Sequence, residues 1–162
     1  MVRLFYDSVH GVCLGDYTQE QVNVWADGTP DPERWEQSFL GRQVLVARLD
    51  GEIVGFADRQ GDYLDRLYVH KDHQRKGIAR ALCDGLEQGA KGEGVTRMTV
   101  HASITSRGFF EKRGWRVVKE QQVERKGILL TNFVMEKALY QKKSGPGGPL
   151  FARLLTKHRK FV

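Results

Sequence analysis

The first forty residues carry apolar side chains at helical spacing, together with two signals for the start of a helix. Residues 2–9 place valine, leucine and phenylalanine side chains at intervals typical of one helix face. Thr18 and Gln21 have the spacing of a capping box, and Asp31 stands before a proline at the first helical position. The pattern therefore predicts three short helices: one over residues 2–9, one through residue 25 and one over residues 32–39.

From residue 44 onward, apolar residues occur in short runs bounded by turn residues, which is typical of strands. Asp50 and Gly51 have the composition of a hairpin turn between the first two runs. We expect strands over residues 44–47, 53–56, 63–69, 96–100, 115–118 and 129–135, and helices over residues 77–90 and 104–112. Antiparallel strands followed by alternating strands and helices predict an α+β domain with a mixed sheet.

The most informative segment runs from Leu64 to Leu82, where a strand, a basic loop and a helix follow one another. A helix N-terminus leaves backbone N–H groups unpaired and carries a partial positive charge. Gly77 would let a ligand approach the backbone closely, and Arg75 and Lys76 add charge. This arrangement predicts a phosphate or pyrophosphate site, and the alternative is a plain helix cap among solvated lysines. Neither the P-loop pattern nor the dinucleotide-binding glycine pattern occurs in the sequence.

The net charge of +6 is concentrated at the C-terminus. Residues 141–162 hold six lysines and arginines and no acid, whereas residues 1–140 hold equal numbers of basic and acidic residues. We therefore expect a domain over residues 1–140 and a flexible basic tail over residues 141–162. The neutral domain argues against nucleic-acid binding by its surface. The tail is either a disordered extension or an amphipathic segment that contacts a membrane, a nucleic acid or a partner.

The content of cysteine and the lack of long apolar runs favour a cytoplasmic protein. The sequence has no apolar run long enough to span a bilayer and no signal peptide. Its two cysteines, Cys13 and Cys83, lack metal-ligand spacing, and Cys83 lies on the apolar side of a predicted helix. We expect Cys83 to be buried, while a reactive Cys13 stays open. His70 and His73 are too few to hold a metal, so no metal is expected.

Two motifs resemble those of the GCN5-related N-acetyltransferase (GNAT) superfamily. Gln74, Gly77 and Ala79 match its Gln/Arg-x-x-Gly-x-Gly/Ala motif. Residues 110–115, Phe-Glu-Lys-Arg-Gly-Trp, resemble its later Phe/Tyr-Glu-Lys-x-Gly-Phe motif. The resemblance covers about residues 2–138 and is closest to the YafP-like branch of these acetyltransferases.

The resemblance implies a GNAT-like, mostly antiparallel central sheet flanked by helices. In the family a β-strand precedes the first helix, whereas this chain begins within its first predicted helix. Either the sheet lacks its first strand, or a natural variant of the fold replaces it. A missing edge strand leaves backbone groups unpaired and favours pairing with another chain, so a homodimer and a missing N-terminal segment are the two hypotheses that follow.

The resemblance also implies acetyl-coenzyme A (acetyl-CoA) as co-substrate and direct transfer of its acetyl group to a primary amine of a small molecule or a protein. The strand backbone would pair with the pantetheine arm, and the loop amides would hold the pyrophosphate. A strand N–H near Tyr68 or Val69 would stabilise the oxyanion. The residues expected to contact the coenzyme are Leu67, Tyr68, Val69, Gln74, Arg75, Lys76, Gly77, Ile78, Ala79, Arg80, Ser103 and Phe110.

The proton-handling residues of the family are only partly present. Phe110 stands where many members have a tyrosine that protonates the thiolate, and Ser103 stands where many have an asparagine. Tyr68, His101, Ser103 or a water molecule would have to take over this catalytic role. His101 ends a predicted strand beside the expected acetyl site, where an imidazole would suit a base, although such a histidine can equally be structural.

Two carboxylates are further candidates for the base. Asp65 and Glu52 are other possible bases, which would reach the amine through water. The alternative is that both are solvated or paired with Arg66 and Arg59. These residues therefore stay open between a catalytic and an electrostatic role.

Acceptor specificity is expected in the N-terminal helices and in the hairpin near residues 123–130, which are the least diagnostic parts of the resemblance. Tyr17, Trp25 and Trp35 could line a pocket there or could serve in packing. The sequence thus favours an N-acetyltransferase. The alternative is a non-catalytic acyl-CoA-binding sensor or assembly subunit, motivated by the replacement of the family's tyrosine by Phe110 and by the missing first strand.

Overall fold

The computed structural model describes residues 1–29 and 31–140, and the predicted basic tail lies outside these residues. The helices are α1 (Val2–Val12), α2 (Gln19–Trp25), α3 (Pro32–Ser38), α4 (Ile78–Gly92) and α5 (Ile104–Lys112), with short 3-10 turns at Cys13–Gly15 and Lys71–His73. The strands are β1 (Gln43–Leu49), β2 (Glu52–Gln60), β3 (Tyr63–Val69), β4 (Arg97–Ser103), β5 (Arg116–Arg125) and β6 (Ile128–Ala138). Among these helices, none is both long enough and apolar enough to cross a bilayer.

The strands form one sheet of six in the order β1-β2-β3-β4-β6-β5. Every neighbouring pair is antiparallel except β3 and β4, which are parallel. This confirms the predicted α+β class with a mixed, mostly antiparallel sheet. Within the described residues no strand precedes α1, as expected, so β1 and β5 form the two edges. Pairing of either edge with a second copy stays a prediction.

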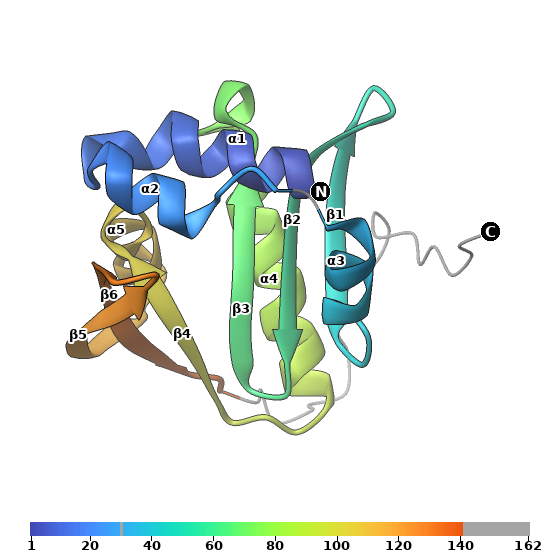
Figure 1. Ribbon diagram of the computed structural model, residues 1–162. Helices are drawn as coiled ribbons and strands as arrows, with labels where there is room; N and C mark the ends of the chain where they lie inside the picture. Colours follow the sequence, from blue (N-terminus) through green and yellow to red (C-terminus); the bar gives the residue numbers. More distant parts are fainter. Residues whose placement is uncertain (30, 141–162) are drawn as a thin grey trace, which may run out of the picture.

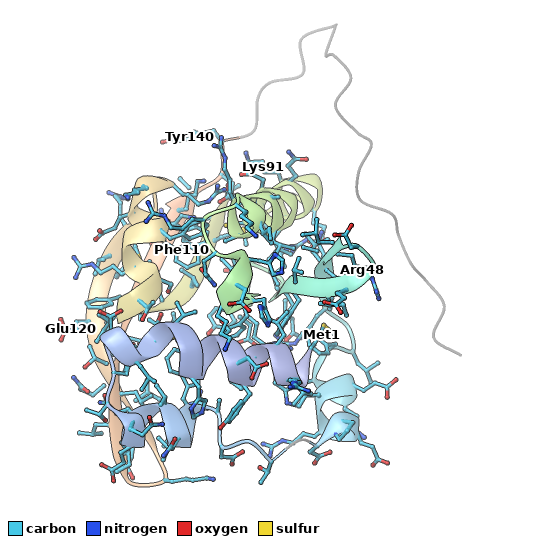
Figure 2. The ribbon with its side chains drawn as sticks, turned by 90° about the horizontal axis from the view of Figure 1, so that it is seen from above. Met1, Arg48, Lys91, Phe110, Glu120 and Tyr140 are labelled. Atoms are coloured by element: carbon cyan, nitrogen blue, oxygen red, sulfur yellow. The ribbon has the colours of Figure 1, made fainter. Side chains whose placement is uncertain are left out.

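Helices cover both faces of this sheet. Helix α4 packs against β1, β2 and β3, and α5 packs against β4 and β6. Helices α1, α2 and α3 lie on the opposite side, as Figure 1 shows from the front and Figure 2 from above. The main hydrophobic core lies under α4 and α5 and includes Leu86, Met98, Phe110, Trp115 and Met135. A smaller apolar cluster lies under α1 and α2.

Local sequence signals position the helices on the side opposite α4. The Thr18 side chain accepts a hydrogen bond from the Gln21 N–H, and the Gln21 side chain accepts one from the Thr18 N–H, which confirms the capping box. The Gln21 amide also donates to the Leu129 carbonyl at 2.8 Å, so the same residue ties α2 to β6. Asp31 caps α3 through the Arg34 N–H, as its place before Pro32 predicts.

The sheet opens between β3 and β4. These strands pair only at Tyr63–Thr99 and at Leu64–Val100, and then they diverge, as Figure 1 shows. The backbone of β3 beyond Leu64 consequently has no strand partner on the β4 side. The opening lies at the C-terminal end of β3, directly before the basic loop that leads into α4.

The β5–β6 hairpin is longer than the sequence pattern predicts. The predicted strands were 115–118 and 129–135, whereas the structure has a ladder that continues to the pair Arg125–Ile128. The hairpin turns at Lys126 and Gly127, both with positive φ, of 50° and 79°. Most of β5 is exposed because it is an edge strand, so the apolar and polar residues along it do not alternate clearly.

Candidate functional site

A cavity of about 320 Å³ lies where β3 and β4 separate, on the face of the sheet that α1, α2 and α3 cover. This volume lies near the lower end of the roughly 300–1,000 Å³ typical of small-molecule sites. Its aromatic wall consists of Phe5, Tyr17, Trp25, Trp35, Tyr63 and Tyr68. The prediction that Tyr17, Trp25 and Trp35 line a pocket is confirmed, and the β5–β6 hairpin closes it with Val123, Arg125, Leu130, Thr131 and Asn132.

A β-bulge in β3 turns polar side chains toward the cavity. Asp58 and Arg59 of β2 pair with Arg66 and Leu64, which leaves Asp65 as the extra residue. Leu64 packs into the core under α4, whereas both Asp65 and Arg66 line the cavity. A bulge of this kind re-aims side chains that strict alternation would send to opposite faces. The strand can therefore present two adjacent charges on one side.

The Tyr68 ring lies deep in the aromatic wall. It contacts Phe5 edge-on at 4.9 Å and Phe56 at 5.7 Å between ring centroids. Burial raises the pKa of the Tyr68 phenol well above its usual value, an effect that the Trp25 indole partly opposes. The phenol is therefore neutral at physiological pH and cannot serve as a base. Full proton transfer to a thiolate, whose ordinary pKa is about 8.5, would be uphill.

His101 and Ser103 both reach the cavity from β4, but their surroundings differ. The His101 ring packs edge-on against Tyr63 at 5.2 Å and is exposed. The Ser103 hydroxyl caps α5: it accepts the Ser106 N–H at 3.1 Å and donates to the Ser106 hydroxyl at 3.0 Å. Because its proton is already engaged, Ser103 is less available as an acid than His101 is as a base. Catalytic roles for both stay predictions.

A four-residue charge network lies beside the cavity. Asp58 is fully buried and accepts hydrogen bonds from Arg66 at 2.6 Å and from Arg42 at 3.0 Å. Arg42 also binds Asp65 at 2.7 Å. The predicted alternative of an Asp65–Arg66 pair is wrong, because the register places Arg66 directly opposite Asp58. Asp65 nevertheless lines the cavity, so it stays a candidate base acting through water.

For the other carboxylate, Glu52, the alternative of a solvated side chain is confirmed, whereas its pairing with Arg59 is wrong. Arg59 is buried and binds Glu93 through two hydrogen bonds, of 2.7 and 3.0 Å, rather than Glu52. Glu52 opens β2 at the hairpin turn, is exposed, and does not line the cavity. A role for Glu52 as the base therefore has no geometric support.

The loop before α4 has the geometry that an anion site requires. Gly77 is the N-cap of α4 and has a left-handed φ of 79°, without a capping side chain. Arg75 is also left-handed, with a φ of 60°. The N–H groups of the first helical turn, including those of Ile78, Ala79 and Arg80, precede the first intrahelical hydrogen bond, so they are free to bind an anion.

The basic side chains around this loop are exposed and make only weak contacts within the protein. The Lys76 ammonium donates to the Asp72 carbonyl at 3.3 Å, and Arg80 lies 3.9 Å from Asp84 one turn along α4. Neither contact prevents its side chain from binding another group, because exposed contacts of this kind contribute little to stability. Both side chains, like Arg75, thus stay predicted contacts for a phosphate group.

The free edge of β3 is oriented by its pairing with β2. The His70 N–H donates to the Val54 carbonyl at 2.8 Å, so by alternation the backbone of Tyr68 also faces β2. The backbone groups of Leu67 and Val69 therefore point into the opening toward β4. Of the two amides proposed for an oxyanion, the Val69 N–H is thus the one that faces the site.

The Val69 carbonyl is held from two directions. The Gln74 amide donates to it at 2.7 Å, and the Ser8 hydroxyl of α1 donates to it at 3.1 Å. Gln74 therefore braces the loop against the strand. Ser8 was missed by sequence reasoning, because no pattern links a serine in the first helix to a strand 61 residues later.

Phe110 does not lie on the cavity. It is 2% exposed and packs into the core between Phe109 and Trp115, at 5.2 and 5.3 Å from their centroids. Its predicted contact with the coenzyme stays a prediction. Both cysteines are buried, as expected for Cys83, and burial raises the pKa of the Cys13 thiol, which argues against a reactive thiolate.

Arg125 lies in the hairpin near residues 123–130 that was expected to determine acceptor specificity, whereas Asn132 is a cavity residue that sequence reasoning missed. Arg125 lies beside the hairpin turn, and Asn132 lies within β6, which pairing with the distant strand β4 brings to the cavity. Asn132 lies directly opposite Ser103 in the β4–β6 ladder, and its Oδ1 atom is buried without a hydrogen-bond partner among the described residues. Leu130 and Asn132 share a face by strand alternation, which is the one signal that could have placed Asn132 here.

Comparison with known proteins agrees with this arrangement. The family model described as the acetyltransferase (GNAT) domain matches residues 13–137. The chain belongs to the GNAT family of N-acetyltransferases, which confirms the resemblance drawn from the motifs at residues 74–79 and 110–115.

Individual relatives extend this result. The N-acetyltransferase YafP of Escherichia coli K12 is 40% identical over 135 residues, which cover 83% of this chain and 85% of YafP. A GCN5-related N-acetyltransferase from Rhodopseudomonas palustris superposes with a TM-score of 0.82 at 34% identity, covering 85% of this chain and 87% of that one. YncA of Salmonella typhimurium, solved with its cofactor acetyl-CoA, has a TM-score of 0.62 at 21% identity over 91% of each chain, which shows a shared fold.

Proposed function

We propose that this protein transfers the acetyl group of acetyl-CoA to the amine of a small molecule or protein by direct attack. The observation that carries the proposal is the meeting of three features: the free edge of β3, the left-handed Gly77 at the start of α4, and the cavity between β3 and β4. The first two suit the two ends of an extended coenzyme. The third leaves room for an acceptor beside the thioester.

The coenzyme would lie along the opening in two parts. The pantetheine arm would pair with the outward-facing backbone groups of Leu67 and Val69, as a strand would. The pyrophosphate would accept hydrogen bonds from the first free N–H groups of α4, where the absence of a Cβ on Gly77 allows close approach. Arg75 and Lys76 would add positive charge from the loop.

The chemical step forms one N–C bond and breaks one C–S bond. A bound ammonium first loses a proton, to His101 or through water to Asp65, and its nitrogen then attacks the thioester carbonyl. The Val69 N–H stabilises the oxyanion. Collapse releases the thiolate, which takes up one proton, while the second amine proton passes to solvent. The Tyr68 phenol can donate a hydrogen bond to the sulfur without giving up its proton, because its pKa is raised by burial.

Thiol release from acetyl-CoA across a panel of amines, with coenzyme affinity measured in parallel, tests the proposal. We expect amine-dependent release by the wild type and a clear fall in kcat for His101→Gln at unchanged coenzyme affinity. Failure to bind the coenzyme would overturn the proposal.

Binding without release would instead support a non-catalytic acyl-CoA-binding module. One observation favours this second candidate: the position at which many relatives carry a phenol is a buried phenylalanine, Phe110, that lies in the core. For this second candidate we expect the wild type and His101→Gln to bind the coenzyme equally. Neither should release thiol with any amine.

A further inference from the structure

The aromatic wall of the cavity already contains its own cation. The Arg66 guanidinium lies 4.0 Å from the Phe39 ring centroid and 5.4 Å from that of Trp35. Aromatic rings can attract an ammonium group, but Trp35 of the cavity wall already lies near the Arg66 guanidinium, and Phe39 lies outside the lining. The remaining rings, which include Phe5, Trp25 and Tyr68, offer flat apolar surface.

The charges on the cavity wall leave one arginine unbalanced. Asp65 is bound by Arg42, and Arg66 is bound by Asp58, so these four groups neutralise one another. Arg125 also lines the cavity, and no carboxylate within residues 1–29 and 31–140 forms an ion pair with it. The cavity as a whole is thus positive.

The positive charge of Arg125 acts on neighbouring rings of the cavity wall. Burial raises the pKa of the Tyr63 and Tyr68 phenols, and the positive charge of Arg125 counteracts this effect in both. Its guanidinium therefore acts on two rings of the cavity wall, rather than only on the solvent outside the hairpin.

Asn132 supplies a second recognition group. Its Oδ1 atom is buried and makes no hydrogen bond within the described part of the chain. A buried carbonyl oxygen without a donor is costly, and its location on the cavity wall means that a ligand N–H could satisfy it.

Building on the proposed transferase function, we propose that the acceptor is a small amine with an aromatic or similarly flat apolar body and a carboxylate group. The carboxylate pairs with Arg125, the body packs among the aromatic rings, and the amine donates a hydrogen bond to Asn132 Oδ1. Polyamines and aminoglycosides fit poorly, because the one carboxylate among the lining residues, Asp65, is already bound by Arg42.

Two matched substrate pairs test the proposal with acetyl-CoA saturating: 4-(aminomethyl)benzoate against benzylamine, and phenylalanine against phenethylamine, with spermidine as the polycation. We expect at least one carboxylate-bearing amine to have a higher kcat/KM than its uncharged partner and than spermidine. Arg125→Gln should lower kcat/KM for that substrate by about 10- to 100-fold, the range of a charge-assisted contact, and change its partner by less than about 3-fold.

Arg116→Gln is the matched control, because it removes the same charge from the same strand outside the cavity. Arg116→Gln should leave kcat/KM unchanged for both members of a substrate pair. The KM for acetyl-CoA should be the same in wild type, Arg125→Gln and Arg116→Gln, which separates acceptor recognition from coenzyme binding. Asn132→Leu should lower kcat/KM for both members of a pair by about 5- to 10-fold without lowering the melting temperature, since Oδ1 makes no hydrogen bond to lose.

The outcomes separate the inference from the function on which it rests. Turnover of spermidine or the uncharged amines in preference to both acids would overturn the inference while leaving the transferase intact. Equal losses for acid and amine in Arg125→Gln would do the same. Full activity of Asn132→Leu would refute the placement of the amine, and absence of thiol release with every amine would instead refute the transferase itself.

Discussion

The two faces of the sheet are built from different kinds of side chain. Under α4 and α5 lie apolar residues that are almost fully buried, among them Leu86, Met98 and Trp115. Under α1, α2 and α3 lie half-buried aromatic rings and a charge network around Asp58, and they surround a cavity. One face is filled by packing and the other leaves room for a ligand. Stability is therefore expected to depend mainly on the first face, and acceptor specificity on the second.

The charged groups follow the same division. On the other side of the sheet, the buried carboxylate of Glu87 in α4 accepts hydrogen bonds from Lys137 at 2.7 Å, Arg113 at 3.1 Å and Trp115 at 3.3 Å. These contacts join α4 to the end of α5 and to β6. On the cavity face, Asp65 keeps one side toward the opening. A charge that is fully enclosed holds elements together, whereas a charge at a cavity can act on a ligand.

Two tryptophans provide the largest test of this contrast. Trp115→Ala should lower the free energy of unfolding by about 3–5 kcal/mol, because Trp115 is 2% exposed and its loss leaves a core cavity. Trp25 lies on the cavity wall, so Trp25→Ala should lower the free energy of unfolding by less than Trp115→Ala does. It should lower kcat/KM for the acceptor by more than Trp115→Ala does. Denaturant titration and steady-state kinetics on both variants would measure this. A stability loss in Trp25→Ala as large as that in Trp115→Ala would break the contrast.

The buried carboxylate is the next test. Glu87→Gln should cost about 3 kcal/mol at neutral pH, because it leaves Arg113 and Lys137 without their buried partner. Burial raises the pKa of Glu87, but the hydrogen bonds from Lys137 and Arg113 outweigh burial and lower it overall. A lowered folded-state pKa stabilises the protein above the ordinary carboxyl pKa of roughly 4.3, and this contribution is lost as pH falls through the folded value.

Wild-type stability should consequently fall more steeply than that of Glu87→Gln between neutral pH and about pH 3, as followed by denaturant titration at each pH. Glu111→Gln is the control: it removes an exposed partner of Arg107 and should stay within about 0.5 kcal/mol of wild type. Parallel pH curves for wild type and Glu87→Gln would show that this carboxylate does not contribute in the manner described.

A pair of glycines at the two ends of α4 tests where the ligand lies. Gly77 and Gly94 have nearly the same left-handed φ, of 79° and 81°, and both have open space around them. Substitution of either by alanine should cost about 1–2 kcal/mol from backbone strain. Only Gly77→Ala should also weaken coenzyme binding, by roughly tenfold in calorimetry, since its Cβ meets the phosphate. Equal coenzyme affinity in both variants would remove Gly77 from the site.

The smallest expected effects concern the Val69 carbonyl. Ser8→Ala and Gln74→Leu each remove one donor to it and should each cost about 0.5–1.5 kcal/mol of stability. Each alone should lower kcat a few-fold, and the double variant should lower it by more than the product, since one donor suffices to hold the strand end. A double-mutant cycle on kcat measures this coupling. Additive losses would mean that the two donors act independently.

Elements with strong local signals were predictable from the sequence. β3 has the predicted bounds, Tyr63–Val69, and the caps at Thr18 and Asp31 start their helices as expected. The loop ending at Gly77 was recognised because its chemistry is compressed into a few consecutive residues. In each case the determining interactions lie within about four residues along the chain.

The cavity could be predicted only in part, because it depends on pairing between distant segments. The aromatic residues of the first helices and the hairpin near residues 123–130 were visible as candidates, but Asn132 reaches the cavity only through the pairing of β6 with β4. The partners of Arg66 and Asp65 were mistaken for a related reason. A single extra residue in β3 determines which charged side chains of β2 and β3 pair. The composition of the strand does not indicate that a bulge is present.

The short contact between β3 and β4 has a mechanical consequence. Two residue pairs join the half-sheet β1-β2-β3 to the half-sheet β4-β6-β5, so the structure resembles two plates sharing a narrow hinge. An extended ligand that fills the opening along β3 would join the plates over a greater length. The bound ligand would then stabilise the sheet as well as react. Its release after each turnover would again leave the two half-sheets joined by only the short β3–β4 contact, so that they could move more freely relative to each other.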